Sequence, residues 1–126
     1  MTNGLTLDTG ALLALERGDT RVRALFQRAI ENRLTLTIPA GVVAQAWRGG
    51  SRQARVAHLL NDPDVEVPSL DDVTARAVGV LCGRSGHADI VDAHVVLLAR
   101  ERGHHVVTSD PDDLRGVDPS LRLIVV

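Results

Sequence analysis

The sequence has no lysine and no tyrosine, and each absence limits the chemistry open to the protein. All 14 basic residues are arginines, so any reaction that depends on a lysine side chain is excluded. Aromatic residues make up only 2% of the chain, with one Trp and one Phe. Folds that stack RNA bases on several aromatic side chains need more than this, which argues against a base-stacking platform.

Cysteine and long apolar runs are scarce as well. The single cysteine, Cys82, cannot form an internal disulfide and is too isolated for a zinc site. No apolar stretch approaches the length that a bilayer crossing needs. The first ten residues lack the basic region and apolar core of a signal peptide. We therefore expect a cytoplasmic protein that does not act at a membrane.

What the chain does contain indicates a compact domain with uneven charge. Its 126 residues are 44% hydrophobic, with a mean hydropathy of +0.06, which predicts one domain over residues 1–126. Residues 17–55 hold eight arginines and two acids, whereas residues 56–126 hold six arginines and twelve acids. This asymmetry fits an anionic partner on the basic half and a cation in the acidic half. Charges that intermix in the fold are the alternative.

The hydrophobic pattern alternates between short strands and helices. Strands are expected at residues 5–8, 34–38, 65–67, 104–110 and 121–126. Helices are expected at residues 9–18, 20–33, 40–50, 51–62, 70–84 and 88–103. This alternation predicts an α/β fold, a parallel sheet between two helical layers, with an α+β domain as runner-up. Within it we expect Thr9 and Ser69 to cap helices, and the last strand to be buried on both faces.

Aspartates gather where this fold would place a ligand site. Asp8 ends the first strand and Asp110 ends the fourth, and in a parallel sheet ligands bind beyond the carboxyl ends of the strands. Asp89 and Asp92 stand one turn apart at the start of the helix between those strands. Singly, such acids are common as helix caps and turn residues. Together they predict a hard divalent cation, Mg²⁺ or Mn²⁺, held by carboxylates and water.

Three segments in order resemble the PIN-domain ribonucleases, in particular the VapC-type toxins of bacterial toxin–antitoxin modules. These segments are "LTLDTGALLALERGD", "IPAGVVAQAWRGG" and "DIVDAHVVLLARERGHHVVTSDPDDL", and the resemblance covers nearly the whole chain. It implies a PIN-like three-layer α/β/α sandwich with about five parallel strands. It also implies a metal-dependent endoribonuclease that cleaves RNA phosphodiester bonds.

The resemblance also assigns site residues. Asp8, Asp92 and Asp110 match the family's acids and are the predicted catalytic metal ligands, with Asp113 an alternative to Asp110. Asp89 is an additional acid and a supporting ligand. Thr108, which we group with the substrate-contacting residues, resembles the small polar residue that braces such a site. The family's remaining acid, usually a glutamate on the helix after the second strand, is matched by Gln45.

The expected substrate, RNA, would be held through its phosphates. Arg48, Arg52 and Arg55 are the expected phosphate contacts, because guanidinium groups fork onto phosphates. A solvated helix face is the alternative.

The composition also bears on function classes other than a nuclease. Receiver-type and dehalogenase-type phosphoryl-transfer proteins ordinarily need a lysine, which the chain lacks. A catalytically weak PIN domain that binds RNA or protein remains the rival, favoured by Gln45.

The resemblance implies two protein partners as well. A VapB-like antitoxin would place its C-terminal segment in a groove beside the site, with a basic residue among the acids. Residues 9–18 and 20–33 and the helix that carries Trp47 are the expected groove walls. Burial of Trp47 in the core is the preferred alternative for that side chain. A homodimer is also expected.

Overall fold

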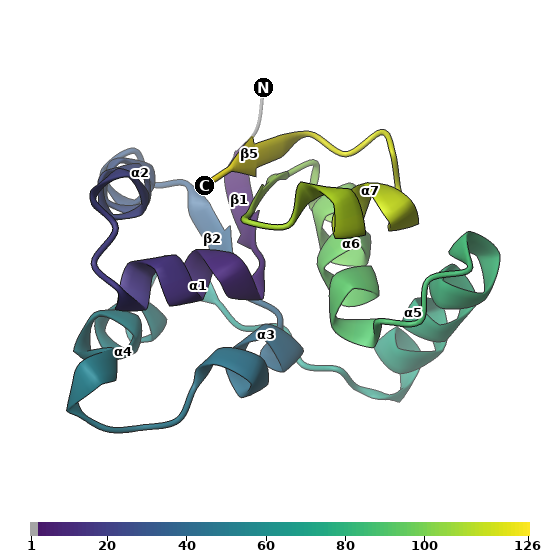
Figure 1. Cartoon of the computed structure of the whole chain (residues 1–126), viewed down its shortest axis with the longest axis horizontal. Coiled ribbons are helices and arrows are strands. Elements are labelled where there is room, and N and C mark those ends of the chain that lie inside the picture. The colour runs from purple at the N-terminus through teal and green to yellow at the C-terminus, as the bar shows by residue number, and fades with distance from the viewer. Residues whose placement is uncertain (1–2) are drawn as a thin grey trace.

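The computed structural model describes residues 3–126 and places a parallel sheet at the centre of the chain (Figure 1). The strands are β1 (Gly4–Leu7), β2 (Thr35–Thr37), β3 (Val65–Glu66), β4 (His105–Thr108) and β5 (Leu123–Val125). The helices are α1 (Thr9–Glu16), α2 (Thr20–Glu31), α3 (Ala40–Ala46), α4 (Ala54–Leu60), α5 (Asp72–Ser85), α6 (Ile90–Arg102) and α7 (Pro111–Val117), with a short 3-10 turn, η1 (Ser51–Gln53), before α4. The predicted α/β class and five-stranded parallel sheet are confirmed.

The strand order β3-β2-β1-β4-β5 puts the first strand in the middle of the sheet. Leu5 of β1 is in register with Leu36 of β2 on one side and with His105 of β4 on the other. From β1 the chain moves outward to β3, and it then crosses back to β4 on the opposite side. The carboxyl ends of β1 and β4 therefore meet at the point where strand order reverses, which is the position favoured for ligand sites.

Two groups of helices flank the sheet, α1 to α4 on the left and α5 to α7 on the right in Figure 1. Helix α1 packs against α2, α3 and α4, and helix α6 packs against α5 and α7. Both α1 and α6 also contact the sheet. The fully buried core lies between these layers and includes Leu7, Leu36, Ile38, Val95 and Val107.

Local details differ from the sequence-based expectations at several helix starts. Asp8, and not Thr9, caps α1, and its side chain accepts from the Thr9 amide. Asp71, and not Ser69, caps α5, because the Asp71 carboxylate accepts from the amide three residues on. In both cases a carboxylate one or two positions away satisfies the helix's free N–H groups.

Two further expectations are wrong. The last strand is not buried on both faces: β5 is an edge strand that pairs only with β4, and Val125 is 51% exposed. Trp47 is not a core residue, since it is 39% exposed at the end of α3.

None of the helices formed by residues 3–126 has the length and apolar composition that a bilayer crossing requires.

Candidate functional site

Asp8 is held rigidly at the end of β1. It is only 6% exposed, and both carboxylate oxygens accept hydrogen bonds. Oδ1 accepts from the Thr9 amide at 2.7 Å, and Oδ2 accepts from the Thr108 hydroxyl at 2.9 Å. Because Thr9 begins α1 and Thr108 ends β4, three elements determine where this carboxylate points.

The Thr108 hydroxyl connects the two strand ends. It donates to Asp8 and at the same time accepts from the Asp110 amide at 2.9 Å. Thr108 is fully buried, whereas Asp110 is exposed at the start of α7. A single hydroxyl therefore sets the turn that carries Asp110 relative to Asp8.

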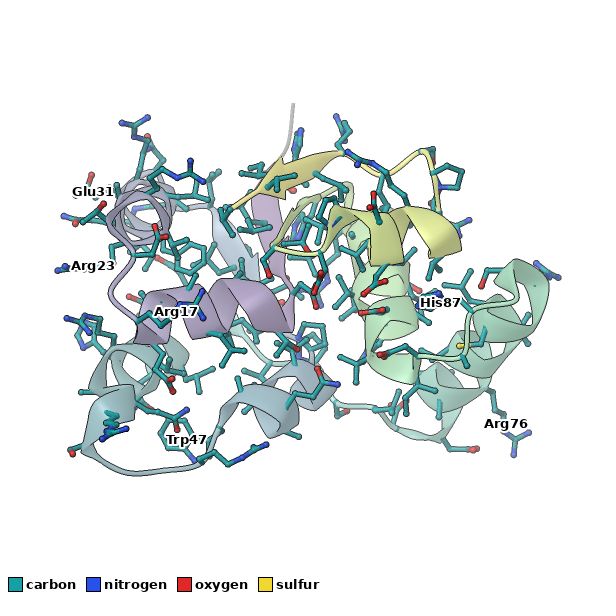
Figure 2. The ribbon with its side chains drawn as sticks, in the orientation of Figure 1. Arg17, Arg23, Glu31, Trp47, Arg76 and His87 are labelled. Carbon is teal, nitrogen blue, oxygen red and sulfur yellow. The ribbon has the colours of Figure 1, made fainter. Side chains whose placement is uncertain are left out.

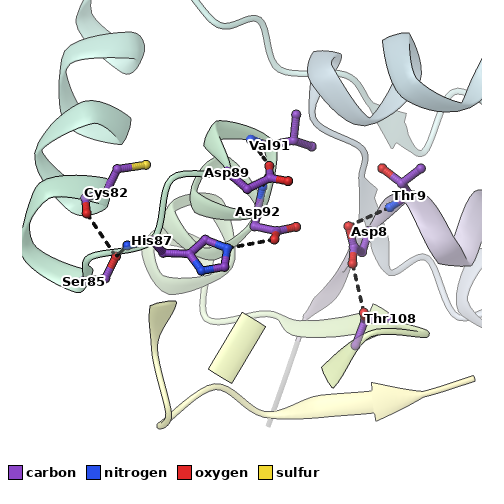
Figure 3. Close-up of polar contacts among 9 residues, drawn as sticks. All are labelled: Asp8, Thr9, Cys82, Ser85, His87, Asp89, Val91, Asp92 and Thr108. Atoms are coloured by element: carbon purple, nitrogen blue, oxygen red, sulfur yellow. Dashed lines mark hydrogen bonds and ion pairs between the residues drawn. The ribbon is translucent and has the colours of Figure 1, made fainter. Parts of the chain in front are cut away.

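Asp89 and Asp92 enter the site from the N-terminus of α6. Asp89 caps this helix, and its Oδ1 accepts from the amides of Val91 and Asp92 at 2.9 and 3.0 Å. Asp92 follows in the first turn of the helix. In Figure 3 the carboxylates of Asp89 and Asp92 point toward that of Asp8. The helix N-terminus favours these negative charges.

Electrostatic effects identify four aspartates as one group. Burial raises the pKa of Asp8, and the charges of Asp110 and Asp89 raise it further, against the two hydrogen bonds that lower it. Burial also raises the pKa of Asp92, helped by the charges of Asp89 and Asp8 and opposed by a hydrogen bond from His87. Carboxylates that repel one another in this way favour a bound cation.

His87 is a member of the site that the sequence did not identify. Its Nε2 lies 3.0 Å from Oδ2 of Asp92, and its side chain is 23% exposed (Figure 3). His87 lies in the connection between α5 and α6, where its amide donates to the Ser85 hydroxyl. A histidine five residues before Asp92, outside the helix, carries no periodic signal.

Gln45 lies beside the start of α1. The hydroxyl of Thr9 donates to Oε1 of Gln45 at 2.5 Å, and Thr9 directly follows Asp8. Helix α3 is brought close to the start of α6 at Gly41, where an added Cβ would lie 3.1 Å from a Val91 methyl. Position 45 is therefore linked to Asp8 through the neighbouring residue Thr9.

Two other acids, Asp112 and Asp113, closely follow Asp110 in the chain. Both are exposed in the first turn of α7. Neither contributes to the raised pKa of Asp8 or of Asp92. Of the two alternatives for the last acid, Asp110 therefore has the closer electrostatic link to the site.

The predicted phosphate contacts lie around the connection between α3 and α4. Arg48, Arg52 and Arg55 are all exposed. Arg48 donates to the carbonyls of Ala44 and Trp47, and Arg55 donates to the carbonyl of Glu16 at 3.4 Å. A shallow groove contains Gln45, Arg48 and Arg52 together, so two of the three arginines share a surface with Gln45.

Comparison with known protein families matches residues 5–118 to the PIN domain. The chain belongs to the PIN domain family. PIN domains are generally nucleases and generally use divalent metal ions. The comparison with curated protein sequences gave no significant match.

Two solved structures share the PIN fold of this chain. One is described as FitAB bound to an IR36 DNA fragment, at 14% identity and a TM-score of 0.66, covering 96% of this chain and 94% of the other. The second is FitAcB from Neisseria gonorrhoeae, at 16% identity and a TM-score of 0.62, covering 95% and 96%.

The donor set suits the metal ions that PIN domains use. Asp8, Asp89, Asp92 and Asp110 offer carboxylate oxygens, which hard divalent cations prefer. Within residues 3–126, no three acidic, histidine or cysteine side chains already stand in positions to ligate one ion. The chemistry of the side chains and their mutual repulsion fit a divalent ion, and a bound ion would draw the carboxylates closer together.

Proposed function

We propose that this PIN domain is a metal-dependent endoribonuclease and the toxin of a type II toxin–antitoxin pair. The observation that carries the proposal is the group of four aspartates at the junction of β1, β4 and α6. Two of them, Asp8 and Asp92, have raised pKa values caused by burial and by the neighbouring carboxylates. Repulsion within such a group destabilises the folded protein unless a bound cation offsets it.

Asp8, Asp92 and Asp110 are the proposed catalytic ligands of Mg²⁺ or Mn²⁺, with Asp89 in support and Asp113 as the alternative to Asp110. A bound divalent ion supplies a water of lowered pKa and stabilises charge on the scissile phosphate. Asp8 is oriented by the Thr9 amide and the Thr108 hydroxyl. His87 holds Oδ2 of Asp92 through its Nε2.

RNA is the proposed substrate, and the arginines beside Gln45 are its proposed phosphate contacts. The exposed Arg52 side chain makes no hydrogen bond or ion pair within residues 3–126, so its guanidinium is available. Arg48 uses one nitrogen on backbone carbonyls and retains further donors. With few aromatic side chains, recognition by backbone shape is favoured over base stacking.

A VapB-like antitoxin is the proposed partner, supported by the likeness to FitAB and FitAcB. A groove lined by α1, α2 and α4, and not by the expected helix that carries Trp47, contains Leu15, Phe26 and Leu59. Arg23 and Glu31, labelled in Figure 2, line the same groove. An amphipathic segment of the antitoxin would bury its apolar side there.

A homodimer also belongs to the proposal. Helix α5 exposes Val73 at 77% and Val80 at 54%, and apolar side chains gathered in this way are typical of protein contacts. Sedimentation as a dimer at micromolar concentration is expected. A monomer at that concentration would contradict it.

Gln45 favours a second candidate function. A neutral amide replaces the expected acid, and it is engaged by the Thr9 hydroxyl. The second candidate is a PIN domain with little catalysis that binds RNA or protein.

The deciding experiment is RNA cleavage by the purified protein with Mn²⁺ and with EDTA. We expect cleavage of folded RNA in Mn²⁺, loss in EDTA, and a loss of at least about 100-fold in Asp92→Asn. Asp112→Asn is the matched control, because Asp112 is an exposed aspartate outside the group. Cleavage that survives in Asp92→Asn would refute the assigned site. RNA binding without any cleavage would favour the second candidate.

A further inference from the structure

Gln53 is a buried amide whose hydrogen-bonding capacity is completely used. It is 3% exposed. Its Nε2 donates to Oε1 of Glu16 and to the carbonyl of Ala46, both at 2.6 Å. Its Oε1 accepts from the amides of Arg48 and Gly49 at 2.7 and 2.9 Å. Two donors and two acceptor positions are all that an amide side chain has.

These four bonds join the α3–α4 connection to two helices. Glu16 ends α1 and Ala46 ends α3, whereas the two accepted amides belong to the connection itself. Gln53 thus attaches residues 47–50 to the layer that also contains Gln45. No other side chain within the described residues bonds the amides of Arg48 and Gly49.

The connection contains two consecutive glycines, and the Gln53 bonds help to hold their backbone in one conformation. Gly49 and Gly50 have φ angles of 75° and 96°, a region that glycine enters without strain. Neither glycine would meet another atom within 4 Å of an added Cβ. Two consecutive exposed glycines lose much conformational entropy on ordering, and the Gln53 bonds offset that loss.

Arg48 belongs to the anchored segment, and Arg52 directly precedes Gln53 in η1. Arg48 and Arg52 line the shallow groove together with Gln45 and Gln53. Gln45 accepts from Thr9, which follows Asp8. The groove therefore joins the two guanidinium groups to Gln45, whose partner Thr9 adjoins Asp8 in the chain.

We infer that Gln53 is a positioning residue for the substrate: it holds the loop of Arg48 and Arg52 where these arginines bind RNA phosphates beside the scissile one. This inference rests on the proposed ribonuclease function. Gln53 touches no reacting atom, so its loss weakens substrate binding and leaves chemistry and metal affinity unchanged. Preordering the loop lowers the entropy cost of binding.

The amide itself is required, which allows a sharp choice of variants. Gln53→Glu keeps the oxygen that accepts from Arg48 and Gly49, but it cannot donate to Ala46 and it places a carboxylate against Glu16. Gln53→Met keeps the length and removes all four bonds. Gly50→Ala disturbs the same loop at a surface position with Gln53 intact, so it tests the loop without a buried change.

The test combines steady-state cleavage with a double-variant cycle in which Arg52→Gln removes one phosphate contact. We expect both Gln53 variants and Gly50→Ala to raise KM about tenfold, with kcat and the Mn²⁺ half-saturation unchanged. In the otherwise wild-type protein, Arg52→Gln should weaken RNA binding and lower by about one the slope of log binding constant against log salt concentration. In the Gln53→Met background, Arg52→Gln should have little further effect on RNA binding. Arg76→Gln, exposed on α5 (Figure 2), is the control.

Folding and loop order are read separately. Melting temperature and circular dichroism establish that each variant is folded. Trp47 is the only tryptophan and tyrosine is absent, so tryptophan fluorescence reports on this loop alone. Acrylamide quenching of Trp47 should increase in Gln53→Met.

Additive effects of Gln53→Met and Arg52→Gln on RNA binding would overturn the inference. A fall in kcat with KM unchanged, in variants that remain folded, would also overturn it. Failure of the proposed function looks different, because wild-type protein would then not cleave RNA in Mn²⁺. The coupling can still be measured in that case, by equilibrium RNA binding with Ca²⁺.

Discussion

Gln45 stands where an acid is expected, and its contact with Thr9 predicts how an acid would behave there. Gln45→Glu keeps an oxygen to accept from the Thr9 hydroxyl and adds a negative charge next to the aspartate group. Hard cations are bound largely through carboxylate charge. We expect the Mn²⁺ concentration for half-maximal cleavage to fall on the order of tenfold, as measured by Mn²⁺ titration of RNA cleavage.

Asp89 provides the complementary test. Asparagine caps helices as well as aspartate does, so Asp89→Asn keeps the bonds to Val91 and Asp92 and removes only charge. This variant should require more Mn²⁺ than the wild type. If Gln45→Glu leaves the metal requirement unchanged, position 45 does not act on the ion.

The raised pKa of Asp92 predicts a pH-dependent stability. The folded protein holds the Asp92 proton more tightly than the unfolded chain does. The stability from this group is therefore fully present below the ordinary carboxyl pKa and is lost as pH rises through the raised pKa. At neutral pH, Asp92→Asn should increase the free energy of unfolding by about 1 kcal/mol.

Urea unfolding in EDTA at several pH values measures this difference. The gain should disappear below the ordinary carboxyl pKa, where Asp92 is protonated in both states. Asp112→Asn, at an exposed position of α7, is the control. A constant gain for Asp92→Asn at all pH values would mean that repulsion is not its source.

At the scale of single residues, the sequence singled out the four aspartates and Thr108, but not His87 or Gln53. Asp8 and Asp110 follow strands, and strand ends can be recognised from apolar runs. His87 and Gln53 act through contacts across the chain, which no local pattern reports. Trp47 was expected in the core because large aromatic side chains usually are, and the short α3 instead leaves it exposed.

Helix α7 is the element that the sequence analysis did not predict. No helix or strand is expected at residues 111–117, where aspartates and a proline dominate the start. In the structure Pro111 occupies the first turn, where its missing N–H costs nothing. Asp112 and Asp113 favour the helix N-terminus, and Leu114 and Val117 bury one face. The signals of a helix start were present, but the helix is too short for periodicity to reveal it.

The close approach of α1 to the turn between β4 and α7 gives a prediction about how these elements pack. A Cβ at Gly10 would lie 1.9 Å from Oγ and 3.0 Å from Cβ of Ser109. Gly10→Ala should therefore destabilise the fold by about 1–3 kcal/mol through overpacking. It should also shift the turn that carries Asp110 and weaken Mn²⁺ binding.

Ser109→Gly supplies the control for this effect. In that background Gly10→Ala should cost little, since the clashing atoms are gone and alanine suits a helix. Chemical denaturation of the four proteins of this cycle measures the coupling. Equal effects of Gly10→Ala in both backgrounds would contradict the packing explanation.

The strands were predicted within a few residues, but their environment was not. Residues 121–126 are apolar enough for a buried strand, yet β5 lies at the edge of the sheet. Apolar content indicates a strand, and the order of strands decides how much of it is covered. That order depends on crossovers between distant segments, which a single sequence does not specify.

Across the whole molecule, the uneven charge of the sequence corresponds to the two sides of the sheet. The arginine-rich residues 17–55 form α2, β2, α3 and the connection to α4, on the left in Figure 1. The acidic residues 56–126 include α5, α6 and α7 on the right. The charges therefore do not simply intermix, and the aspartate group lies where the two sides meet. A basic surface next to an acidic site suits a polyanion bound across a metal ion.

The most direct test of this account is the effect of Mn²⁺ on the melting temperature of the wild type, Asp92→Asn and Asp118→Asn. An ion that binds only the folded state raises the melting temperature. We predict a clear increase in the wild type, nearly none in Asp92→Asn, and a wild-type increase in Asp118→Asn, because Asp118 pairs with Ser120 and Arg100 outside the group. Equal increases in both variants would show that these aspartates do not form the metal site.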